Sequence, residues 1–367
     1  MPGALVAGCG SSWSNSSTGP TVPSTLVDGP SMFVTQTLEG DVAQVPLSSG
    51  RIEAAIPLGN GPTRIAASPD GRWLVVGNFG VTSPGRTTSV VDTTTGLVAT
   101  VTTGGQPDSV AVAPNGATAW VTDNAGGTLT GIALEPDDIH ITTVLHIGGH
   151  PGALEISPDS KTAYVADMGA YANPLGNTVE RVDLATGAVT ARADVGTEPC
   201  ATVLSTDGRT LWVSVDGGAH NTKRGEVVPI DTVDFTTGPP ITVGVGPAGM
   251  ALSPSGTTLY VTNAGDPYTL PDIPESKSYS PHERYLNRHD TISVIDLATS
   301  TVTHAISVGI DPWNMVISPL GNEAWVVNAN SDTVSPIDLQ TDRAGPPIRL
   351  PGHPHGIVLV DVHLAVP

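Results

Sequence analysis

Apolar and polar residues alternate along most of the chain in short stretches that end at turn-forming residues. In one copy of this pattern, Met250 and Leu252 stand three and five places after Pro247. Residues two apart lie on the same face of a β-strand, so this spacing predicts a strand with one buried face. Residues 253–256 then supply the Pro, Ser and Gly of a tight turn, and residues 259–261 an apolar second strand. The pattern therefore predicts β-hairpins.

The pattern recurs with a near-constant period. The proline that opens each copy stands at Pro62, Pro107, Pro151, Pro199, Pro247, Pro312 and Pro354, at intervals of 45, 44, 48, 48, 65 and 42 residues. A period in the forties with strand-like chemistry indicates repeated supersecondary units and not one mixed domain. Two further strands follow in each unit, as in residues 290–296 and 302–308. Four strands per unit are typical of a propeller blade.

The two ends of the chain are expected to build one blade together. Residues 31–36, 41–46 and 51–58 have the pattern of a second, third and fourth strand, with no first strand before them. The last copy of the pattern, which begins at Pro354, has a first strand but no second, third or fourth strand after it. A composite blade of three N-terminal strands and one C-terminal strand closes the ring at seven blades and leaves no open inter-blade face. A closed ring favours a monomer.

The second strand carries a family signature. Tyr260-Val261-Thr262-Asn263 is, letter for letter, the repeat of the YVTN β-propeller family, which the chain resembles from about Ser31 to its C-terminus. The resemblance implies an all-β, seven-bladed propeller over residues 31–367. It says less about activity, because the relatives include cell-surface repeat proteins, periplasmic propellers and, more distantly, seven-bladed lactonases.

Composition and charge narrow the class of protein. The chain has 42 Gly and 33 Pro among 367 residues, with 14% charged residues and a net charge of −20. This composition suits an all-β protein that works outside the cytoplasm. An acidic surface repels phosphates and argues against nucleic acid as a partner. No apolar run reaches the roughly 18 residues of a membrane-spanning helix.

The first thirty residues differ from the rest. Val6-Ala7-Gly8-Cys9 resembles the lipobox of bacterial lipoproteins, in which the cysteine is lipidated, and residues 10–30 are rich in Ser, Thr and Pro, as in a flexible tether. Residues 1–8 lack the basic start and apolar run of a signal peptide. Either the start lies upstream and Cys9 carries a lipid, or Cys9 is an incidental residue in a disordered tail. A membrane is expected to be contacted only through this anchor.

Polar side chains gather beside the repeated prolines. In a propeller, the loops before the first strand and after the second strand open on one face, where ligands usually meet the channel. On this rim, imidazoles beside carboxylates suggest a divalent metal or an acid/base pair, with metal candidates His150, Glu198, Asp311 and His353. Ligand-binding candidates on the same rim are Trp313, Asn314, His355, Asn263 and Asn328. The alternative is that Asn and Asp there cap turns and bond the backbone.

One loop breaks the period. The fifth blade carries an insertion over residues 264–290 that contains three Tyr, two His and two Arg, in a chain with only 4% aromatic residues. Loops of this length inside a compact domain are usually functional or disordered. The insertion is expected to form a lid or partner-contact loop, with Arg284 and Tyr285 as ligand-binding candidates, or else a plug over the rim.

Three classes of function follow. The first is a secreted or cell-surface binding module for a protein, glycan or small molecule. The second is a lactonase-like hydrolase with a metal or acid/base site at the channel mouth, and the third is a purely structural cell-envelope repeat protein. A divalent metal is the one cofactor that the pattern suggests, and the sequence has no phosphate-binding loop, nucleophile elbow or haem-attachment motif.

Overall fold

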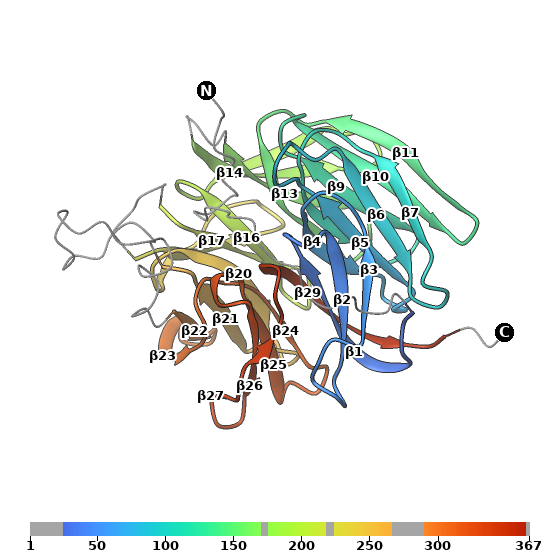
Figure 1. Ribbon diagram of the computed structural model, residues 1–367. Coiled ribbons are helices and arrows are strands. Elements are labelled where there is room, and N and C mark those ends of the chain that lie inside the picture. The colour runs from blue at the N-terminus through green and yellow to red at the C-terminus, as the bar shows by residue number, and fades with distance from the viewer. Residues whose placement is uncertain (1–24, 170–174, 218–223, 266–289, 365–367) are drawn as a thin grey trace, which may run out of the picture.

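The structure, a computed structural model, describes residues 25–169, 175–217, 224–265 and 290–364. Over these residues the chain forms seven antiparallel sheets, which stand around a central axis as the blades of a β-propeller (Figure 1). The helical content of this part of the chain is the short 3-10 helix η1 (Ala329–Ser331), and no helix in it is long and apolar enough to cross a membrane. The predicted fold class is confirmed.

The innermost strand of every blade begins at one of the repeated prolines. Proline has no backbone N–H to donate, so the first residue of a strand is one of the few strand positions that tolerates it. The inner strands are β4 (Pro62–Ala67), β8 (Pro107–Val112), β12 (Pro151–Ile156), β16 (Pro199–Leu204), β20 (Pro247–Leu252), β24 (Pro312–Ile317) and β29 (Pro354–Val362).

Six blades are continuous in sequence, and their strands follow one another outward from the axis. The second strands are β5 (Trp73–Asn78), β9 (Thr118–Asp123), β13 (Thr162–Gly169), β17 (Thr210–Val215), β21 (Thr258–Asn263) and β25 (Glu323–Asn328). The third strands are β6 (Thr87–Asp92), β10 (Thr128–Glu135), β14 (Leu175–Asp183), β18 (Glu226–Asp231), β22 (Thr291–Asp296) and β26 (Thr333–Asp338). The outer strands are β7 (Val98–Thr102), β11 (Asp138–His146), β15 (Val189–Asp194), β19 (Ile241–Thr242), β23 (Thr301–Ser307) and β27 (Arg343–Ala344), with β28 (Ile348–Arg349) beside β26.

The seventh blade is composite, as predicted. Its strands run in the order β29, β1 (Gly29–Gln36), β2 (Asp41–Pro46) and β3 (Ala54–Pro57). The antiparallel register of β1 on β29 extends from Gly29 opposite Val362 to Gln36 opposite Pro354. Leu26, before the predicted start of the propeller, is also buried in the cluster that contains Val362. The C-terminal strand therefore closes the ring between the first and last continuous blades.

Aromatic side chains of the second strands fill the space between blades. Trp325 packs with Met32 and Val34 of the composite blade, and Tyr164 stacks on Phe235 of the next blade with a ring-centroid distance of 6.2 Å. These contacts place the apolar core between the sheets. The channel at the axis is left to the inner strands.

A hydroxyl near the end of the second strand joins neighbouring blades. The Oγ1 of Thr262 accepts a hydrogen bond from the Gly249 N–H at 2.8 Å and donates one to the Trp313 carbonyl of the next blade at 2.7 Å. The same bridge to the next blade recurs at Thr35, Thr122 and Ser214. Each bridge satisfies a buried backbone donor of its own blade and fixes the next inner strand beside it.

Candidate functional site

The inner strands are irregular where they enter the channel. In β4 the register with β5 shifts between Pro62 and Ile65, and β8, β12, β20 and β24 shift at the equivalent place. A β-bulge interrupts the strict alternation of side chains and re-aims the residues within it. The two residues after each proline therefore take directions that the period of two does not predict.

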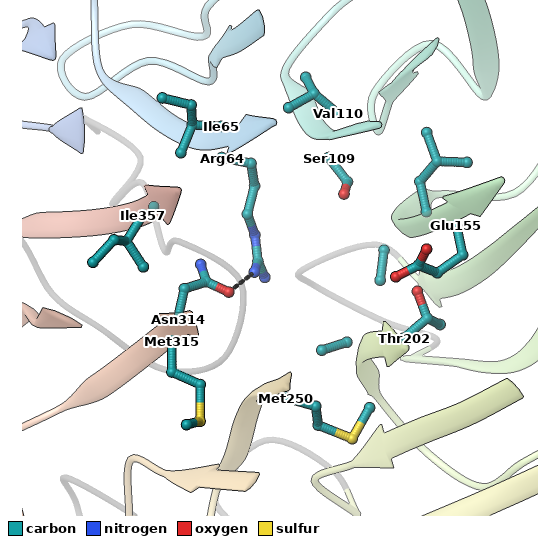
Figure 2. Close-up of a pocket in the computed structure, with 14 residues that line it drawn as sticks. Arg64, Ile65, Ser109, Val110, Glu155, Thr202, Met250, Asn314, Met315 and Ile357 are labelled. Carbon is teal, nitrogen blue, oxygen red and sulfur yellow. Dashed lines mark hydrogen bonds between the residues drawn. The ribbon is translucent and has the colours of Figure 1, made fainter. Parts of the chain in front are cut away.

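A cavity of about 150 Å³ lies at the axis, lined by residues from all seven inner strands. The third residue after the proline supplies an apolar belt made of Ile65, Val110, Leu154, Met250, Met315 and Ile357. The polar lining comes from Arg64, Ser109, Glu155, Thr202 and Asn314 (Figure 2). The site thus combines an apolar belt with a small number of polar groups, as small-molecule sites usually do.

Arg64 extends from β4 across the channel. Its Nη1 donates a hydrogen bond to Asn314 Oδ1 at 2.8 Å (Figure 2), and the Asn314 amide nitrogen donates to the carbonyl of His355 at 3.0 Å. The Arg64 guanidinium carbon is 6.0 Å from the ring centroid of Trp313, whose ring lies 4.3 Å from that of His355. Arg64 is therefore held by Asn314 and Trp313 of the β24 blade, which are themselves in contact with His355 of the composite blade.

Two carboxyl groups lie in the same region. Glu155 lines the cavity, and burial raises its pKa to about 8. Burial also raises the pKa of Asp108, against an opposing effect of the Arg64 charge. A protonated carboxyl donates a hydrogen bond as well as accepting one. Glu155, whose pKa is raised, is therefore protonated more readily than an exposed glutamate and then donates as well as accepts.

His355 is neutral in this setting. Burial lowers its pKa well below the ordinary 6.5, and the charges of Arg64 and His353 lower it further. Its side chain is only 4% exposed. A neutral imidazole packed against Trp313, with the two rings tilted by 31°, contributes hydrogen-bonding capacity without charge.

Several buried polar atoms around this cavity make no hydrogen bond within the described part of the chain. They are Asp108 Oδ2, Thr202 Oγ1, Trp313 Nε1 and His355 Nδ1. A buried polar group without a partner costs about 1–3 kcal/mol of folding free energy. Of the four, Thr202 belongs to the wall of the cavity itself, where a hydrogen bond from a bound molecule would recover this cost.

The structure brings together three of the ligand-binding candidates, namely Trp313, Asn314 and His355. It does not bring Asn263 and Asn328 to them. Asn263 accepts a hydrogen bond from the Gly244 N–H at 3.0 Å and donates to Ser293 Oγ at 3.0 Å, and Asn328 donates to Ser335 Oγ at 2.9 Å. Both side chains tie the second strand to the third, and neither lines the cavity.

The four metal candidates stand in four different turns. Glu198, Asp311 and His353 have φ values of 63°, 60° and 59°, and Asn330 donates a hydrogen bond to Asp311 at 2.9 Å. Burial lowers the pKa of His353 to about 4. Among the described residues, no three His, Cys, Asp or Glu side chains come close enough to hold a metal ion. His150 and the other three are thus not gathered into one site.

Arg284, Tyr285 and Cys9 lie outside the described residues, as does residue range 266–289 of the insertion. The sequence prediction did not include Arg64, Glu155 or Thr202. One signal was available for Glu155, because it stands between Leu154 and Ile156 in an apolar inner strand. A charged residue at such a position is either paired or functional.

No protein-family model and no curated protein matches the chain. Solved structures do. A periplasmic gluconolactonase of Pseudomonas aeruginosa is 19% identical, with a TM-score of 0.67, over 91% of this chain and 99% of that one. A putative 6-phosphogluconolactonase of Bacteroides fragilis is 17% identical, with a TM-score of 0.67, over 92% and 100%. Hydrazine synthase of Kuenenia stuttgartiensis is 17% identical, with a TM-score of 0.67, over 83% and 97%. These similarities establish the shared fold.

Proposed function

We propose that this protein is a binding module, located outside the cytoplasm, that takes a small oxygen-rich molecule into its central channel. The observation that carries the proposal is the gathering of Arg64, Asn314, Glu155 and Thr202 on the wall of one cavity. Similarity to a periplasmic gluconolactonase supports both the location and a ligand with many oxygen atoms.

The channel is favoured over the outer loops because its polarity is otherwise costly. Thr202 Oγ1, in the wall of the cavity, is buried without a partner in the described structure, and a ligand that supplies a hydrogen bond recovers the lost free energy. The binding site thus lies deeper than the loop face that the sequence indicated.

A substitution that fills the cavity tests this proposal. Ser109 lines the cavity (Figure 2), so Ser109→Phe is expected to weaken every channel ligand at least tenfold by occupying its space. The measurement is the shift in melting temperature with a panel of sugar acids, lactones and hydroxy acids, since a ligand of the folded state stabilises it. Ser255→Phe, at an exposed turn, is the control. Equal shifts in wild type and Ser109→Phe would place binding elsewhere, and no shift in wild type would remove the proposal.

Hydrolysis of a lactone is the second candidate, and Glu155 favours it. A general acid or base works best when its pKa is near the working pH, and burial brings the pKa of Glu155 to about 8. In such a reaction the ionised form of Glu155 takes a proton from the water that attacks the lactone carbonyl, and the protonated Glu155 then donates that proton to the leaving ring oxygen, while the Arg64 charge stabilises the oxyanion. Two of the structural neighbours are named as lactonases.

Turnover separates an enzyme from a binding module. With glucono-δ-lactone, acid release by the wild-type protein is expected to exceed the spontaneous rate, and Glu155→Gln is expected to lower it tenfold or more. Glu323→Gln, at an exposed position, is the matched control. A wild-type rate equal to the spontaneous rate would leave binding as the function.

A further inference from the structure

The fourth and sixth blades share one framework in their outer halves. In each, a tryptophan of the second strand stands opposite a proline of the third strand, whose carbonyl accepts a hydrogen bond at 2.8 Å from the N–H of a glycine that two further prolines follow. The residues concerned are Trp212, Pro229 and Gly238 in the fourth blade and Trp325, Pro336 and Gly345 in the sixth. Proline donates no ladder hydrogen bond, so the outer strand is shortened to β19 in one blade and divided into β27 and β28 in the other.

A pocket of about 330 Å³ lies on this framework in the sixth blade. Its described lining comes from β25, β26, β27 and the residues beside them, and it shares no residue with the lining of the channel cavity. Pro336 is half-buried there, and Trp325 is 6% exposed. Trp325 Nε1 makes no hydrogen bond in the described part of the chain and keeps contact with solvent, whereas the Nε1 atoms of Trp212 and Trp313 are enclosed. The pocket thus combines an apolar surface with an accessible indole donor.

A row of charged side chains crosses the three strands at the pocket. Glu323 stands opposite Asp338 in the antiparallel register, and Asp338 stands opposite Arg343. All three are exposed and line the pocket. The same places in the fourth blade hold Thr210, Asp231 and Thr236. Since both aspartates accept hydrogen bonds from N–H groups of the turn that follows, the aspartate belongs to the framework, and Glu323 and Arg343 are what the sixth blade adds to it.

The pocket offers donors and acceptors side by side. Arg343 forms no ion pair within the described part of the chain, so its guanidinium is available to donate to a ligand, as is Trp325 Nε1. Asp338 uses Oδ1 for the turn, which leaves its Oδ2 and the Glu323 carboxylate as acceptors. Because the acidic and basic groups are adjacent, an anion meets the carboxylates and a cation meets the guanidinium. A neutral ligand whose hydroxyls both donate and accept satisfies both kinds of group.

We infer that this pocket binds one neutral sugar unit, away from the channel. The hydroxyls of the sugar bond Arg343, Asp338 and Glu323, and its C–H groups pack on the Pro336 ring and the accessible edge of Trp325. The volume of about 330 Å³ lies in the range of about 300–1,000 Å³ that is usual for small-molecule sites. The inference goes beyond the proposed function, because it concerns a second site that does not use the channel.

The indole N–H signals of the six tryptophans, followed by NMR on the full nitrogen-15-labelled chain, test the inference. Trp325→Phe identifies the signal of Trp325 by removing it. Glucose, galactose or mannose is expected to move this signal in a saturable way, because the sugar lies against that N–H, and to leave the Trp212 signal in place. Acetate and methylammonium, as an anion and a cation of small size, are expected to have no effect on the Trp325 signal.

Two substitutions test the pocket itself. Arg343→Gln is expected to weaken sugar binding roughly fivefold or more, because a charged donor is lost. Its matched control is Arg349→Gln, which changes an exposed arginine of β28 that does not line the pocket and is expected to bind as wild type does. Gly345→Phe is expected to abolish the effect of sugars on the Trp325 signal. A Cβ at Gly345 meets Pro336 Cγ at 3.4 Å, an ordinary contact, so the added ring extends beside Pro336 without a clash.

The outcomes separate this site from the channel. If no sugar moves the Trp325 signal, or if Arg343→Gln binds as tightly as wild type, the inference is wrong. Equal affinity for methylammonium or acetate would show recognition of charge and would also overturn it. Sugars that move the Trp313 signal alone, and no longer do so in Ser109→Phe, bind in the channel, so the proposed function then stands and this inference falls. A saturable shift of Trp325 in a protein whose channel binds nothing supports this inference and leaves the proposed function without support.

Discussion

A chain that ends before Pro354 is expected to lose its stable monomeric fold. The deleted strand β29 buries Ile357, Val360 and Val362, which are 6%, 5% and 0% exposed. Each such side chain contributes about 1.5–3 kcal/mol by burial, so the three contribute a large part of a typical stability of about 5–15 kcal/mol. The deletion also exposes the edge of β1 and the adjacent blade faces, which invites association with other chains.

The measurement is urea unfolding together with size-exclusion chromatography. The control is a chain that ends after Leu364 and retains β29 whole. The truncated chain is expected to be aggregated or unfolded at 25 °C, and the control to behave as wild type. A truncated monomer with an unchanged unfolding midpoint would show that the ring does not depend on the composite blade.

The fold was predictable because the repeated letters are themselves structural. Tyr260 packs between sheets, Val261 is fully buried, and Thr262 bridges to the next blade through the Trp313 carbonyl. Asn263 joins its strand to β22 and to the Gly244 backbone. Each letter thus meets a packing or hydrogen-bonding requirement that recurs in several blades, and the repeat makes these positions visible in the sequence.

The same regularity explains why the metal candidates were misleading. Glu198, Asp311 and His353 occupy a turn position with a left-handed backbone, which Gly61 and Gly246 occupy in other blades with φ values of 64° and 62°. Glycine at equivalent positions indicates a backbone requirement, because it adopts positive φ without steric cost. The prolines that follow made these residues appear as a ring of ligands, whereas the structure uses them in turns.

The cavity residues were harder to predict because the bulges decide their directions. Asn314 and Trp313 are adjacent in sequence, and both reach the Arg64 region only because the start of β24 departs from a regular register. Arg64 comes from β4, which is 250 residues away from Asn314. No local pattern connects the two positions. Closure of the ring, and not any motif, brings them together.

The last prediction concerns how the stability of the protein depends on pH through Glu155. The ordinary pKa of glutamate is 4.5, and burial raises that of Glu155 to about 8 in the folded protein. Between these values the folded state binds a proton that the unfolded state has lost, so this group makes stability fall as pH rises, and its effect is constant above about pH 8.

At about 1.36 kcal/mol per pKa unit, the difference between the two pKa values of Glu155 corresponds to about 5 kcal/mol in the free energy of unfolding. Access of water through the cavity lowers this effect to about half. Glu155→Gln removes the titration, so it is expected to match wild type near pH 5 and to be about 2 kcal/mol more stable at pH 8. Other groups with shifted pKa values titrate equally in wild type and in this variant, so their contributions to the pH dependence cancel in the comparison. Among them are Asp41, whose pKa burial raises to about 7, and His353, whose pKa burial lowers to about 4.

Urea unfolding of both proteins from pH 5 to 9 measures the difference in stability, with Glu323→Gln as the exposed control. Parallel curves for wild type and Glu155→Gln would mean that Glu155 ionises normally, and the acid/base role proposed for it in lactone hydrolysis would then be lost.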